Sequence, residues 1–228
     1  KVKNHLLYLA TKLDLSEGHD LAERINKTWT DIFHHLMAAG LIEGDDEDRL
    51  LRVHWLMAYN YQLDQWKQIE SIKQRFNLRN YEGNHAALLV DLKEYVETLG
   101  MASLAFAEIY GPELSNGFGS YGPQPVVRSK IVEASEKLRR LGQIAPFLSL
   151  LIAVRLRCPD DGETYLRAVR LGELFAFRVY SWLGRRSNVG QSRLLRLGYD
   201  IFTGRQPVAQ ALDNLQRAAL EFCSDAQF

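Results

Sequence analysis

A group of five arginines and one asparagine in the last quarter of the chain, termed the arginine cluster, is well suited to bind an anion. Its members crowd into the end of one predicted helix, a short loop and the start of the next helix: Arg178, Arg185, Arg186, Asn188, Arg193 and Arg196. Guanidinium groups present planar donor forks that match carboxylates and phosphates, and free amides at a helix start also favour anions. The segment predicts an anion or nucleic-acid site. Alternatively, Arg185 and Arg186 cap the preceding carbonyls and pair with Glu173 or with the acidic half of the chain.

The histidines form no convincing catalytic or metal-binding pattern. His19-Asp20 is reminiscent of the metal phosphohydrolases that use a His-Asp pair, with His5 and Asp91 as the further ligands, but a His-Asp dipeptide at a helix start is more simply a cap. The remaining candidates lack a second ligand or a second copy of their motif: His34, His35, His54, and Glu82 with His85. Phosphate-loop and nucleophile-elbow motifs do not occur. We therefore predict no enzyme active site, no metal and no cofactor.

Glycine and proline concentrate in residues 111–124, which separate two helical halves. A phosphate-binding loop leads directly into a helix, whereas Pro123 and Pro125 follow the glycines here. The stretch is predicted to be a linker, or a flap that carries Phe118 and Tyr121.

Charge is distributed unevenly along the 228 residues. Residues 1–123 hold 12 Lys and Arg against 18 Asp and Glu, a net of −6, and residues 124–228 hold 16 against 10, a net of +6. Two cysteines make no disulfide framework, so a reduced cytoplasmic setting is expected. No apolar run reaches the length of a membrane span, and no membrane contact is expected.

Apolar residues repeat at three and four throughout, which predicts an all-α bundle of about eight to ten helices. The halves would form two packed subdomains, an acidic one over residues 1–110 and an Arg-rich one over 125–228. Trp29 and Trp55 lie on apolar helix faces and are expected in the core. One helix is predicted at the very start of the chain, and the next over residues 16–39. A third begins at the acidic residues 45–48 and continues to residue 59, and further helices are predicted over 63–76, 85–110, 125–141, 145–156, 165–183, 191–202 and 207–223.

The chain opens inside an amphipathic helix, with no capping residue ahead of it. We take this as a sign that a preceding domain is missing. The face of that helix with Leu6, Leu7 and Leu9 would then expose apolar area or cover it with a second copy, giving a homo-oligomer.

Several stretches resemble the helical part of the GmrSD-type restriction family: residues 1–9 (Lys-Val-Lys-Asn-His-Leu-Leu-Tyr-Leu), 25–32, 49–55 and 178–192. The resemblance implies a bacterial or archaeal defence protein with an N-terminal ParB-like nucleotide-hydrolysing domain and, in many members, a C-terminal His-Asn-His-type nuclease domain. Several members act against phage DNA with modified bases. The family's Asp-Gly-Gln-Gln-Arg and Asn-x-Arg-Gly motifs do not occur in this sequence, so no catalytic residue is carried over.

These observations favour a non-catalytic helical scaffold or interaction domain, with the neighbouring domains of the same protein as its partners. The alternative is a nucleic-acid-binding or anion-sensing module that contacts DNA through its Arg-rich half.

Overall fold

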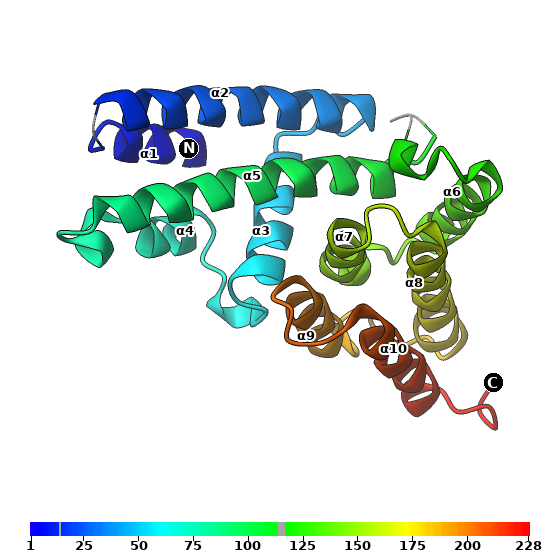
Figure 1. Cartoon of the computed structure of the whole chain (residues 1–228). Helices are drawn as coiled ribbons and strands as arrows, with labels where there is room; N and C mark the ends of the chain where they lie inside the picture. The colour runs from blue at the N-terminus through cyan, green and yellow to red at the C-terminus, as the bar shows by residue number, and fades with distance from the viewer. Residues whose placement is uncertain (14, 114–116) are drawn as a thin grey trace.

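The computed structural model describes residues 1–13, 15–113 and 117–228, and over these residues the fold is all-α, as predicted (Figure 1). It contains ten α-helices and no strand in the described part. The helices are α1 (Val2–Ala10), α2 (Leu15–Ala38), α3 (Asp46–Ala58), α4 (Ile69–Arg75), α5 (His85–Tyr110), α6 (Pro125–Arg140), α7 (Leu148–Arg157), α8 (Gly162–Phe175), α9 (Gln191–Phe202) and α10 (Val208–Phe222). Short 3-10 turns occur at Leu63–Gln65, Leu78–Tyr81, Gly119–Tyr121 and Ala145–Phe147, and α8 continues as a π-helix over Ala176–Trp182.

Helix α5 organises the acidic half. Its start is fixed by Asn84, whose side-chain oxygen accepts a hydrogen bond from Ala87 N at 3.0 Å. Helix α2 runs along one side of α5 in Figure 1, and α3 and α7 contact α5 as well. Helices that pack on several sides of α5 thus bury much of its apolar surface.

Helix α7 connects the two halves. Every residue from Leu148 to Arg155 is buried, as is typical of a helix that is apolar on nearly every side. Helix α7 packs against α3 and α5 of the acidic half and against α8 and α9 of the Arg-rich half. One continuous hydrophobic cluster therefore runs through both halves.

A buried ion pair ties α5 to α7. Arg155 Nε donates to Glu108 Oε2 at 2.8 Å, and the side chains are 9% and 3% exposed. Glu108 Oε1 also accepts a hydrogen bond from the backbone N of Phe118 at 2.7 Å. The Arg155 guanidinium lies 4.6 Å from the ring centroid of Tyr121. Each charge is satisfied by several partners, as burial of an ion requires.

Some of the described residues in the stretch over 111–124 pack into the protein, and others are exposed. Phe118 and Tyr121 are buried, and Tyr121 Oη donates to the carbonyl of Cys158 at 3.1 Å. Residues 114–116 of this stretch lie outside the described residues.

The predicted helix over residues 63–76 is wrong as a single element. The structure has a 3-10 turn, a break and then α4. At the break, Trp66 packs against Trp55 at 5.8 Å between ring centroids, and Ser71 Oγ accepts a hydrogen bond from Lys67 N at 2.8 Å. The Ser71 hydroxyl thus satisfies the Lys67 N–H at the break, and the packing of Trp66 stabilises the interrupted conformation.

The expectation that the first helix exposes the apolar face with Leu6 and Leu9 is also wrong. Leu6 and Leu9 are buried within the described structure, because α1 packs against α2, and Leu7 is partly buried. Trp29 and Trp55 are 9% and 8% exposed, which confirms both as core residues. No described helix has the length and apolar character needed to cross a membrane.

Candidate functional site

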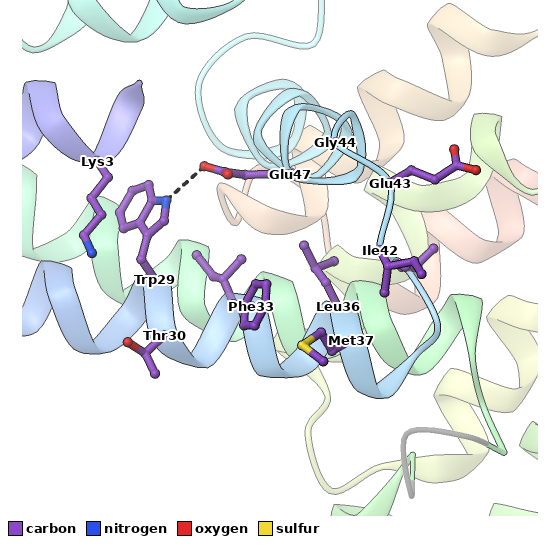
Figure 2. A pocket seen from close by; sticks show the side chains of 12 residues that line it. Lys3, Trp29, Thr30, Phe33, Leu36, Met37, Ile42, Glu43, Gly44 and Glu47 are labelled. Atoms are coloured by element: carbon purple, nitrogen blue, oxygen red, sulfur yellow. Dashed lines mark hydrogen bonds between the residues drawn. The ribbon is translucent and has the colours of Figure 1, made fainter.

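An open groove of about 630 Å³ lies between α2 and the segment that joins α2 to α3 (Figure 2). Five apolar side chains of α2 form one side of it: Trp29, Ile32, Phe33, Leu36 and Met37. Leu41 and Ile42 of the connecting segment and Glu47 of α3 line the other side, and Lys3 of α1 stands at one end.

Three large apolar side chains in this groove are open to solvent. Phe33 is 61% exposed, Met37 is 50% exposed and Ile42 is 79% exposed. Single exposed apolar residues are ordinary on a protein surface, but a group of them around one hollow is typical of an interaction site. Elsewhere on the surface, the exposed rings of Phe177 and Trp182 contact the Phe228 ring at interplanar angles of 71° and 50°.

A hydrogen bond across the groove holds its two sides together. Trp29 Nε1 donates to Glu47 Oε1 at 2.9 Å, as the dashed line in Figure 2 shows. The start of α3 is also held in place. Asp46 Oδ2 accepts a hydrogen bond from Glu43 N at 3.1 Å, and Asp46 forms an ion pair with Arg49 at 3.2 Å. The groove is thus a braced feature of the fold.

Opposite charges stand at the two ends of the groove. Lys3 lies beyond Trp29 at one end, and the exposed Glu43 follows Ile42 at the other (Figure 2). Among the described residues, neither Lys3 nor Glu43 has an ion-pair partner. Both charges are therefore available to a molecule that enters the groove.

The helical spacing of apolar residues over 16–39 predicts only a buried face and does not reveal the groove. At 100° per residue, the five apolar positions of α2 spread over about 140° of the helix surface. Packing on α5 and α1 buries Ile32 and Leu36, which are 2% and 6% exposed, and leaves Phe33 and Met37 outside. The width of the stripe is the signal that could have revealed a second contact face.

The arginine cluster divides in the structure, and three of its members pair with acids of their own half. Arg178 is buried and pairs with Asp225, and its guanidinium lies 4.6 Å from the Phe228 ring centroid. Arg193 pairs with Glu221, which lowers the pKa of that carboxyl through their hydrogen bond. Arg196 pairs with Asp200 at 3.5 Å.

The other three members, Arg185, Arg186 and Asn188, are exposed in the loop after the π-helix. Across the described residues, Arg185 and Arg186 form no ion pair with Glu173 or with the acidic half. Arg155 with Glu108 is the pair that joins the two halves in this set. Loop arginines thus remain available to an external anion.

The candidate histidines lie apart from one another, and three of them lie within hydrogen-bond distance of an oxygen atom on another segment of the chain. His5 Nε2 is 2.7 Å from the Phe76 carbonyl, His35 Nδ1 is 2.8 Å from Ser103 Oγ, and His54 Nε2 is 2.9 Å from Thr98 Oγ1. The described residues hold no group of three or more metal-ligating side chains. Both cysteines, Cys158 and Cys223, are free thiols.

Comparison of the chain with protein-family models, with curated proteins and with solved structures gives no match.

His54 gives the fold a specific pH dependence. Its burial lowers the pKa from 6.5 to about 3, because the charged imidazolium would lose its hydration. Below pH 6.5 the unfolded chain binds a proton at His54 that the folded chain excludes. The free energy of unfolding therefore decreases by about 1.4 kcal/mol for each unit by which the pH is lowered, from pH 6.5 down to about pH 3. In urea titrations, His54→Gln should flatten this loss between pH 6.5 and 4, and an unchanged slope would contradict the assignment. His19→Gln, at an exposed histidine, is the control.

Proposed function

We propose that this chain is a non-catalytic helical interaction domain of a larger, cytoplasmic defence protein of the GmrSD kind. The observation that carries the proposal is the gathering of Phe33, Met37 and Ile42 around one braced groove. Exposed apolar area of this kind is costly in water and is commonly retained where another protein surface covers it.

The sequence resemblance gives the proposal its context. In the GmrSD family, the helical region follows a nucleotide-hydrolysing domain and often precedes a nuclease domain. A rigid helical body with an open docking groove suits a scaffold between such domains, because α2, α5 and α7 belong to one packed core.

A second candidate function is nucleic-acid binding at the loop after the π-helix. The exposed guanidinium groups of Arg185 and Arg186, without carboxylate partners in the described structure, support it. Phosphate contacts of this type position a protein on nucleic acid without reading its sequence.

The groove can be tested in the whole protein encoded by the gene, expressed in a bacterial host challenged with phage. The double variant Phe33→Ser/Met37→Ser should abolish protection at an unchanged protein level, because it removes the apolar contacts while the buried core stays intact. Val90→Ser/Met101→Ser is the matched control, since these residues are 62% and 46% exposed on α5 outside the groove. Protection that survives in the groove variant would refute the proposal.

Salt dependence tests the second candidate. If the loop contacts phosphates, binding of duplex DNA weakens by about 0.9 log units per contacted phosphate for each log unit of salt. Arg185→Ala/Arg186→Ala should reduce this slope by about two contacts. Arg24→Ala/Arg140→Ala removes equal charge from other exposed positions and should leave the slope as it was. Negligible DNA affinity at low salt, or equal slopes in both variants, would exclude the loop as the site.

A further inference from the structure

We infer that the groove binds a second copy of this chain, so that two α2 helices pack antiparallel about a two-fold axis. The inference rests on the proposed function and names the partner of the same surface. It follows from the shape of the groove, from the charges at its ends and from the spacing of the residues on α2.

The surface is complementary to itself in shape. Phe33 and Ile42 project to solvent beside the same hollow that they line. A two-fold axis through the middle of the groove would place the protruding side chains of each copy in the hollow of the other. Such an isologous contact requires a surface that contains both the projection and the space that receives it.

The surface is also complementary to itself in charge. A two-fold axis across α2 reverses the direction of the helix, so it brings the Lys3 end of one groove to the Glu43 end of the other. Both residues are without an ion-pair partner among the described residues, and the dimer would supply one to each. A parallel arrangement would instead bring like charges together, which disfavours binding.

The residues on α2 have the spacing that helix packing uses. The exposed Phe33 and Met37 follow the buried Trp29 at successive i+4 positions, and the three form a row along the helix whose Phe33–Met37 part is open to solvent. Ridges of this kind fit the grooves of a second helix. The shared face of α2 can therefore pack against its own symmetry mate.

Sedimentation velocity over a wide concentration range tests the inference on the 228-residue chain. We expect a monomer–dimer equilibrium that Phe33→Ser weakens at least about tenfold, because large apolar side chains at the centre of an interface contribute most of the affinity. Met101→Ser, outside the groove, should leave the equilibrium within about twofold of the parent. Thermal melting checks that both variants fold.

Charge reversal tests the antiparallel geometry. Lys3→Glu and Glu43→Lys should each weaken the dimer by up to about fivefold, because each places like charges at both ends of the interface. An equimolar mixture of these two variants should recover parental affinity, since opposite charges then meet at both ends. Recovery in the mixture would not occur if the residues acted only through the fold of one chain.

A monomer at every concentration, or a dimer that Phe33→Ser leaves intact, would overturn the inference. A dimer lost in Phe33→Ser but without recovery in the mixture would overturn the antiparallel arrangement. The phage assay separates these failures from failure of the proposed function. A strictly monomeric chain whose groove variant still loses protection would keep the interaction domain and assign the groove to a different partner.

Discussion

The ion pair between Glu108 and Arg155 is the interaction on which the relation of the two halves depends. Two charges that are 3% and 9% exposed must stay together, because separation would leave each one buried without a counter-charge. The pair therefore fixes α7 against α5, and α9 and α8 pack on α7 in turn. The same carboxylate holds the backbone of Phe118, so the return of the chain into the Arg-rich half is fixed at this point as well.

This arrangement gives α2 two faces with different environments. Its inner face packs on α5 and buries Leu21 and Ile25 completely. Its outer face lines the groove, and the hydrogen bond from Trp29 to Glu47 connects this face to the start of α3. Because α3 also packs on α5 and α7, the groove has a fixed shape in the absence of any partner. A preformed surface loses little conformational entropy on binding, which favours association.

The helix pattern could be predicted from sequence because each helix buries a periodic apolar face. Helix α7 is the clearest case, since a run without a polar face must be buried. The break at Trp66 could not be predicted, because it depends on packing against Trp55, which only the fold brings near. Likewise, Arg178 and Arg185 lie in one segment of the sequence, but only Arg178 forms an ion pair in the described structure. Its partner is Asp225, which lies far along the chain, so the pairing could not be predicted from the segment itself. The groove was hidden for a related reason: an apolar side chain at helical spacing has the same pattern whether its own fold or a partner covers it, as Phe33 shows.

Methionine methyl NMR tests the central claim most directly, because the chain has three methionines in three environments. Met37 lies in the groove at 50% exposure, Met101 is 46% exposed on α5 away from it, and Met57 is fully buried. On dilution of the ¹³C-methyl-labelled chain, we expect the Met37 signal to shift with concentration while the signals of Met57 and Met101 stay fixed. A Met37 signal that does not change with concentration, or a Met101 signal that shifts in its place, would contradict the claim that the groove binds a second copy of the chain.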